Sequence, residues 1–180
     1  MGEITFLLGG ARSGKSSYAV DLAKNCQGRV VYLATGISCD EEMERRFEKH
    51  KSDRPDSWET IEEPLHVGSV LKNLSESADL ALLDCLGFLV TNLILHYQDQ
   101  GKDDSQVENA VLEHIIDIAS TARDAELDVI VVSNEVGMGI VPDTSLGRLF
   151  RDILGRANQM IAANADEVLF FVAGLPMKVK

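Results

Sequence analysis

The chain has 180 residues, which suits one domain with a buried core. Its composition, 45% hydrophobic and 26% charged, is ordinary for a soluble globular protein. The net charge of −12 argues against a nucleic-acid partner, because an acidic surface repels a phosphate backbone. The sequence has no apolar run long enough for a membrane span and no basic signal region at its N-terminus, so we expect a cytoplasmic protein. Three widely spaced cysteines, Cys26, Cys39 and Cys85, indicate free thiols rather than disulfides or a zinc site.

Short, nearly all-apolar segments alternate with longer helical patterns. In chain order the pattern predicts strand 4–8, helix 14–26, strand 30–34, helix 41–50, a polar loop 51–64 with a short strand at 58–61, helix 65–75, strand 80–84, helix 86–99, helix 106–126, strand 129–133, helix 144–164 and strand 168–172. Residues 177–180 can add one more strand, antiparallel to the others. Such alternation is typical of a doubly wound, mostly parallel α/β sheet. With no repeat and no linker in the sequence, we expect residues 1–180 to form a single domain.

Residues 9–16 carry the motif GGARSGKS, which matches GxxxxGK[ST] between an expected strand and an expected helix. Glycines let the backbone turn so that consecutive N–H groups face phosphate oxygens, and the helix N-terminus adds its positive dipole. We expect Lys15 to reach the β- and γ-phosphates and the Ser16 hydroxyl to bind Mg²⁺. The motif therefore predicts a P-loop that binds a nucleoside triphosphate through Gly9, Gly10, Ala11, Arg12, Ser13, Gly14, Lys15 and Ser16.

Asp84 ends the expected strand 80–84, and an acid at a strand end commonly holds the magnesium ion of a P-loop site. An aspartate in this position can instead cap the helix that begins at residue 86. The two roles are compatible, and the sequence leaves both open.

His50 ends an expected amphipathic helix, on the same face as Met43 and Phe47. One interpretation is a histidine favoured at a helix C-terminus by the helix dipole. The other is a nucleophile: neutral imidazole attacks a nucleotide α-phosphorus, and nearby cations such as Lys51 and Arg54 stabilise the charge that develops. The residues alone do not decide between them.

Several segments together resemble one family, the bifunctional adenosylcobinamide kinase/adenosylcobinamide-phosphate guanylyltransferases. The similarity is carried by the P-loop, by the segment from His50 to Pro55 with Trp58 after it, by NEVGMGIVP at 134–142 and by FRDILGRANQ at 150–159. It runs essentially from end to end, and the 134–142 block is far more specific than the P-loop.

The resemblance implies a RecA-like P-loop NTPase that uses GTP, ATP and Mg²⁺ and acts on adenosylcobinamide and its phosphate, as a homotrimer. It implies that His50 is the guanylylated histidine and that Ser16 and Asp84 serve the metal. Beyond the P-loop, the implied nucleotide contacts are Ala34, Thr35, Gly36, Lys51, Ser52, Asp53, Arg54, Glu62 and Asp84. The chain departs from the family pattern at Lys49, where some members have a second histidine, and at Asp84, where members carry glutamate.

Some alternatives stay open. The 134–142 block can orient a base or a metal-bound water through Glu135, shape the corrinoid site, or form a subunit contact. The whole chain can also be a small-molecule kinase whose 41–55 segment is a lid, or a RecA-like regulatory ATPase stimulated by DNA. The acidic charge counts against the last of these.

Overall fold

This computed structural model describes residues 2–37, 41, 45, 51 and 54–180. Most of the predicted helix 41–50, including His50, lies outside the described residues. In chain order the elements are β1 (Ile4–Gly9), α1 (Lys15–Ala23), β2 (Val30–Ala34), β3 (Glu59–Glu62), α3 (Val67–Leu74), β4 (Leu80–Asp84), α4 (Leu86–Asp99), α5 (Asp104–Asp124), β5 (Asp128–Asn134), α6 (Ser145–Asn164), β6 (Glu167–Val172) and β7 (Leu175–Lys178).

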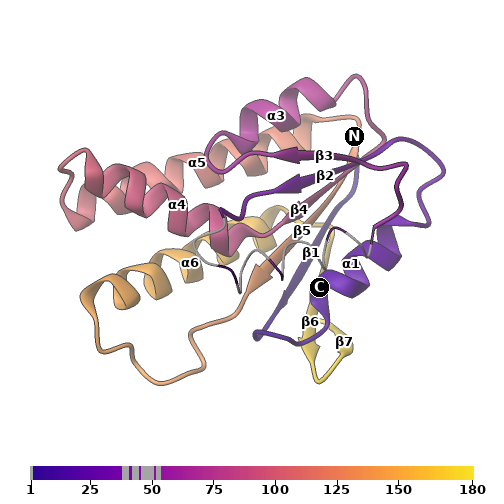
Figure 1. The fold of residues 1–180 in the computed structure, drawn as a ribbon. Helices are drawn as coiled ribbons and strands as arrows, with labels where there is room; N and C mark the ends of the chain where they lie inside the picture. The colour runs from indigo at the N-terminus through magenta and orange to yellow at the C-terminus, as the bar shows by residue number, and fades with distance from the viewer. Residues whose placement is uncertain (1, 38–40, 42–44, 46–50, 52–53) are drawn as a thin grey trace.

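The strands form one seven-stranded sheet in the order β3-β2-β4-β5-β1-β6-β7 (Figure 1). Every neighbouring pair from β3 to β6 is parallel, and only β7 runs antiparallel, against β6. Because parallel strands point the same way, the residues that follow β1, β2, β3, β4 and β5 meet at one edge of the sheet. Ligands of open α/β sheets bind at this carboxyl edge. The predicted doubly wound, mostly parallel sheet is confirmed.

Successive residues of the central strands alternate between two buried faces, as the two-residue period of a strand requires. On β4, Ala81 and Leu83 join the core under α3, α4, α5 and α6, whereas Leu80 and Leu82 join the core under α1. Figure 1 shows α1 on one side of the sheet and the other described helices on the opposite side. A strand covered on both faces needs apolar residues throughout, which is why these strands read as continuous apolar runs.

Several predicted boundaries were wrong by a few residues. Helix α1 ends at Ala23 rather than 26, because Asn25 and Cys26 donate their amides three residues back and close turns instead of continuing the helix. Helix α5 begins at Asp104 rather than 106, because Asp103 and Gln106 form a reciprocal capping box. The antiparallel strand expected at 177–180 is present at Leu175–Lys178.

Among the described residues, none of the helices combines the length and the apolar content that crossing a membrane requires.

Candidate nucleotide-binding site

The P-loop connects β1 to α1, as the motif predicts. Gly14, at the N-cap of α1, has φ of 95°, a region that side-chain-bearing residues rarely adopt. Gly9 leaves no room for a side chain, because a Cβ there would lie 2.7 Å from the carbonyl oxygen of Phe171. Arg12 also has a positive φ, 57°, although it carries a side chain. The backbone therefore takes the tight path that P-loops use to aim N–H groups at phosphate.

Lys15 is held inside this loop. Only 5% of its surface is exposed, and its Nζ donates to the carbonyl oxygen of Gly10 at 2.7 Å and to Oγ of Ser13 at 3.3 Å. Ser16 follows in the first turn of α1 and is half-buried. A cation and a helix N-terminus thus lie together at the end of β1, which favours an anion.

The turn between β6 and β7 supports the P-loop from outside, a role that the sequence analysis missed. Ala173 and Gly174 both have positive φ, 51° and 84°, the pattern of a tight hairpin turn. The amide of Gly174 donates to the carbonyl oxygen of Ser13 at 3.1 Å, and a Cβ on Gly14 would lie 3.2 Å from the Cα of Gly174. The sequence signal for the turn, Ala-Gly between apolar residues, says nothing about where its tip packs.

Three other predicted nucleotide contacts, Ala34, Glu62 and Asp84, lie along the same edge of the sheet. Ala34 pairs with Glu62 on one side and with Asp84 on the other, and Gly9 pairs with Asn134. The ends of β3, β2, β4, β5 and β1 therefore bring these residues to one edge, next to the P-loop. Glu62 is exposed, whereas Ala34 and Asp84 are half-buried.

Thr35 has a different environment from its neighbours Ala34 and Gly36, because it is completely buried. Its hydroxyl donates to the carbonyl oxygen of Cys85 at 2.7 Å and accepts the amide of Cys85 at 3.0 Å. The side-chain amide of Asn92 donates to the carbonyl oxygens of Thr35 and Pro64. In this protein the Thr35 side chain ties the loop after β2 to the loop after β4.

Asp84 does not cap α4, so that alternative is wrong. Cys85 occupies the N-cap position, and Oδ2 of Asp84 accepts a hydrogen bond of 2.8 Å from the hydroxyl of Tyr32. Burial first, and then the Asp84 charge, raise the pKa of Tyr32, so the hydroxyl stays protonated and acts as the donor. The same two causes raise the pKa of the Cys85 thiol to about 12, so Cys85 is not a nucleophile at neutral pH.

Arg54 joins this group from the loop before β3. Its guanidinium carbon lies 3.3 Å from the centroid of the Tyr32 ring, and Nη1 donates to Oγ1 of Thr60 at 3.2 Å. Nε of Arg54 is buried and has no hydrogen-bond partner. A cation stacked on an aromatic face close to a carboxylate is arranged to contact an anionic ligand.

Ser16 and Asp84 offer a hydroxyl oxygen and a carboxylate oxygen, the hard donors that Mg²⁺ prefers. Within the described part of the chain, no group of three or more His, Cys, Asp or Glu side chains could hold a metal on its own. This donor set fits Mg²⁺, which usually binds through one or two protein groups together with substrate phosphates and water. It does not suit a structural zinc site, which needs four protein ligands, mostly cysteine and histidine.

Three of the predicted site residues, His50, Ser52 and Asp53, lie outside the described residues. Lys51 is described and exposed, and its carbonyl oxygen accepts the amide of Arg54 at 3.4 Å. The roles of all four residues stay predictions.

The block 134–142 begins at the same edge and extends away from the core. The amide of Glu135 donates to the carbonyl oxygen of Gly9, and its carboxylate accepts the amide of Gly137. Beyond it the side chains of Met138, Ile140 and Val141 are 83%, 94% and 59% exposed. Glu135 therefore shapes its own loop and links that loop to the P-loop strand.

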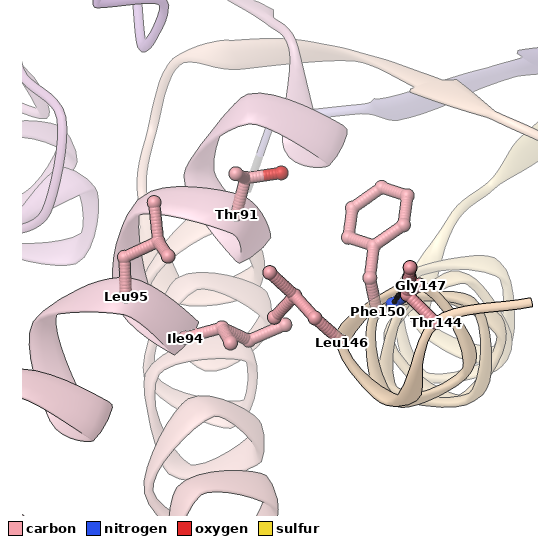
Figure 2. A pocket seen from close by; sticks show the side chains of 7 residues that line it. All are labelled: Thr91, Ile94, Leu95, Thr144, Leu146, Gly147 and Phe150. Atoms are coloured by element: carbon pink, nitrogen blue, oxygen red, sulfur yellow. Dashed lines mark hydrogen bonds between the residues drawn. The ribbon is translucent and has the colours of Figure 1, made fainter.

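A pocket of about 330 Å³ lies between α4 and the start of α6 (Figure 2). Its lining is mostly apolar and consists of Thr91, Ile94, Leu95, Thr144, Leu146, Gly147 and Phe150. In Figure 2 the side chains of Ile94 and Leu146 approach each other across it. The pocket contains none of the predicted nucleotide-binding residues.

Comparison with solved structures supports the fold. A prototypical ATPase from the type III secretion system of pathogenic bacteria superposes with a TM-score of 0.66 at 10% sequence identity. The alignment covers 99% of this chain and 57% of that one, so the chain spans little more than half the length of this neighbour. At such low identity the likeness indicates the fold alone, a RecA-like P-loop domain.

Comparison with known sequences is more specific. The chain is 40% identical over 176 residues to the bifunctional adenosylcobalamin biosynthesis protein CobU of Escherichia coli, covering 96% of this chain and 97% of that protein. It is equally similar to CobU of Salmonella typhimurium, over 96% of this chain and 97% of that protein, and to CobP of Pseudomonas aeruginosa, over 97% and 95%. The model of the family described as cobinamide kinase / cobinamide phosphate guanyltransferase matches residues 5–179. The chain therefore belongs to the CobU family of cobinamide kinases / cobinamide phosphate guanyltransferases.

Proposed function

We propose that this enzyme phosphorylates adenosylcobinamide with ATP or GTP and then transfers GMP from GTP to adenosylcobinamide phosphate, giving adenosylcobinamide-GDP. The observation that carries the proposal is the family match over nearly the whole chain, residues 5–179. A complete P-loop, with acidic and basic side chains on the same edge of the sheet, supports it from the structure.

In the kinase reaction the γ-phosphoryl group passes from the nucleotide to the aminopropanol hydroxyl of the corrinoid. The loop amides from Gly9 to Ser16 and the Lys15 ammonium hold the phosphates and balance their charge. Mg²⁺, held through Ser16 and Asp84, supplies further charge neutralisation when it is bound. Because phosphoryl transfer depends mainly on positioning and electrostatics, the protein needs no covalent intermediate for this step.

In the guanylyl transfer His50 is the nucleophile. A ring nitrogen forms a bond to the α-phosphorus of GTP, the bond to the bridging oxygen breaks, and pyrophosphate leaves. A phosphate oxygen of adenosylcobinamide phosphate then attacks the same phosphorus and releases the imidazole. Arg54 balances phosphate charge at the triphosphate in this proposal, which its stacking on Tyr32, a hydrogen-bond partner of Asp84, supports.

We further propose that residues 1–180 form a single catalytic domain, that the enzyme works in the cytoplasm and that it assembles as a homotrimer. The exposed apolar side chains of Met138, Ile140 and Val141 support a subunit contact, because a soluble monomer rarely exposes a contiguous apolar patch.

A label-transfer experiment tests the function. Incubation with GTP labelled at the α-phosphate should give a labelled protein whose label is labile in acid and stable in alkali, as a phosphohistidine bond is. His50→Ala should abolish the label and largely retain the phosphorylation of adenosylcobinamide, because the kinase reaction does not use the imidazole.

His96→Ala provides the matched control, since His96 is an exposed histidine on α4 whose ring bonds to Gln100 and lies beside Tyr97, away from the P-loop. The His96→Ala variant should take up as much label from GTP as the wild type. Label that persists on His50→Ala would remove His50 from the mechanism. A wild-type protein that phosphorylates the corrinoid but never takes up label would be a kinase alone, and DNA-stimulated ATP hydrolysis without either activity would indicate a regulatory ATPase.

A further inference from the structure

Tyr32 links the two charged groups of the site that come from different segments. It lies on β2, in the core under α1, with 3% of its surface exposed. Its hydroxyl donates to Oδ2 of Asp84 on the neighbouring strand β4, and its ring carries the guanidinium of Arg54 at 3.3 Å. One side chain thus contacts both the expected metal carboxylate and a cation expected at the nucleotide.

The contact with Asp84 leaves the second carboxylate oxygen available. Oδ2 is engaged by the Tyr32 hydroxyl at 2.8 Å, and the other described contacts of this edge do not use Oδ1. A carboxylate held by one oxygen is fixed in orientation, and a ligand fixed in this way binds a metal better than a freely rotating one. Asp84 is the last residue of β4 and is half-buried, so the hydrogen bond from Tyr32 is what ties its carboxylate to the neighbouring strand β2.

The contact with Arg54 fixes the cation in a similar manner. Arg54 has only Thr60 as a side-chain hydrogen-bond partner in the described structure, and the distance is 3.2 Å. The Tyr32 ring provides the flat surface on which the guanidinium rests, and Nε remains buried without a partner. The aromatic face therefore holds the guanidinium together with the hydrogen bond to Thr60.

We propose that Tyr32 is a positioning residue, which orients Asp84 for the Mg²⁺–triphosphate through its hydroxyl and holds Arg54 at the nucleotide through its ring. The inference rests on the proposed function for the identity of the nucleotide and of the metal. The alternative is a core tyrosine whose hydroxyl merely needs a partner. The two differ in one respect: a core residue affects stability only, whereas a positioning residue affects how the protein responds to Mg²⁺.

The test is a calorimetric titration of GTP, with and without Mg²⁺, which needs no catalytic turnover. Tyr32→Phe keeps the ring and removes the hydroxyl. Its GTP affinity without Mg²⁺ should equal that of the wild type. The Mg²⁺ concentration that gives half of the full effect of Mg²⁺ on GTP affinity should rise about 10–100-fold, which is the usual cost of losing a partner that orients a metal ligand. Tyr32→Leu removes the ring as well and should also weaken GTP binding without Mg²⁺, because Arg54 loses its support.

Two controls make the result specific. Tyr97→Phe makes the same chemical change at a half-buried tyrosine that bonds to His114, away from the sheet edge, and should leave the Mg²⁺ response unchanged. In an Asp84→Asn background, Tyr32→Phe should have no further effect on the Mg²⁺ response, since the carboxylate it would orient is absent. Thermal unfolding without ligand monitors folding of every variant.

A Tyr32→Phe protein that responds to Mg²⁺ like the wild type would overturn the proposal. So would a Tyr32→Phe substitution that reduces the response to Mg²⁺ equally in the wild-type and Asp84→Asn backgrounds. These outcomes are separate from a failure of the proposed function. If the wild type neither phosphorylates the corrinoid nor takes up GMP, the function is wrong, and the magnesium titration of nucleotide binding still decides the role of Tyr32.

Discussion

Thr35 lies at the nucleotide-binding edge, yet its hydroxyl is used within the protein. It exchanges two hydrogen bonds with the backbone of Cys85, at 2.7 and 3.0 Å, and is fully buried. The resemblance to the family makes Thr35 a nucleotide contact, and its backbone remains a candidate for that role. The side chain has a structural task, which is to hold the ends of β2 and β4 together.

We therefore expect Thr35→Val to lower the free energy of unfolding by about 1–3 kcal/mol, the cost of leaving the buried amide and carbonyl of Cys85 without partners. Valine has nearly the same shape, so a cavity does not contribute. Thr35→Ser keeps the hydroxyl and should lower the free energy of unfolding much less. Denaturant unfolding of the free protein measures both, and a Thr35→Val protein of normal stability with weakened GTP binding would instead make the hydroxyl a direct ligand.

The P-loop residues could be predicted from sequence because each has a fixed task in a short, contiguous motif. The arrangement of Tyr32, Asp84 and Arg54 could not be predicted, because these residues lie far apart in the chain. The pairing of β2 with β4 brings Tyr32 to Asp84, and the loop before β3 brings Arg54 to Tyr32. In a buried strand a tyrosine reads as an apolar core residue, and nothing in the sequence indicates where its hydroxyl will lie. The assignment of His50 depends on the family resemblance alone.

At the scale of elements, α3, α4 and α5 bring three histidines near one another. His114 on α5 bonds to the hydroxyl of Tyr97 at 2.8 Å, and its ring lies 6.3 Å from that of His66, which precedes α3. Burial, and then the charges of His66 and His96, lower the pKa of His114, while Asp117 and Glu113 oppose the shift. Protonation of His114 is thus harder in the folded protein than in the unfolded chain.

This gives a pH dependence of stability. A group whose pKa is lowered in the folded state binds protons more readily when the chain is unfolded. The contribution of His114 to the free energy of unfolding is therefore intact above its ordinary pKa of 6.5 and is lost as the pH falls below that value. We expect the free energy of unfolding to fall between about pH 7 and pH 5 in part through this histidine. His114→Gln should flatten that part of the slope. An unchanged slope would show that His114 titrates alike in both states.

Element boundaries were less predictable than the elements themselves. Helix α5 starts two residues earlier than expected because the capping pair Asp103 and Gln106 was not recognised, although it is visible in the sequence as an acid three residues before a glutamine. Helix α1 was predicted too long because the turn at Asn25 and Cys26 continues a helical spacing without helical hydrogen bonds. Local hydrogen bonding, which apolar periodicity does not detect, decided both ends.

At the scale of the whole molecule, the sheet was predictable because its central strands are covered on both faces and therefore read as short, continuous apolar runs. The strand order was not predicted, since it depends on which crossovers pack together. In the structure β1 lies between β5 and β6, far in sequence from both. That order places the P-loop beside the β6–β7 turn, a contact between residues 13 and 174.

The proposed homotrimer gives the last prediction. A closed ring of three requires a heterologous contact, in which one surface of a protomer packs against a different surface of the next. Ile140, 94% exposed in the single chain, is the most exposed large apolar residue among those described and lies in the block with Met138 and Val141. Placing a charge at such a position costs the folded protomer little, because the side chain has few contacts within it. Ile140→Asp should therefore keep the thermal stability of the protomer but lower the mass measured by light scattering from three chains to one.

Ile116→Asp, at a 53% exposed isoleucine on α5, is the control and should leave the mass unchanged. An Ile140→Asp protein that remains trimeric would place the subunit contact elsewhere, and a wild type with the mass of one chain would refute the trimer itself.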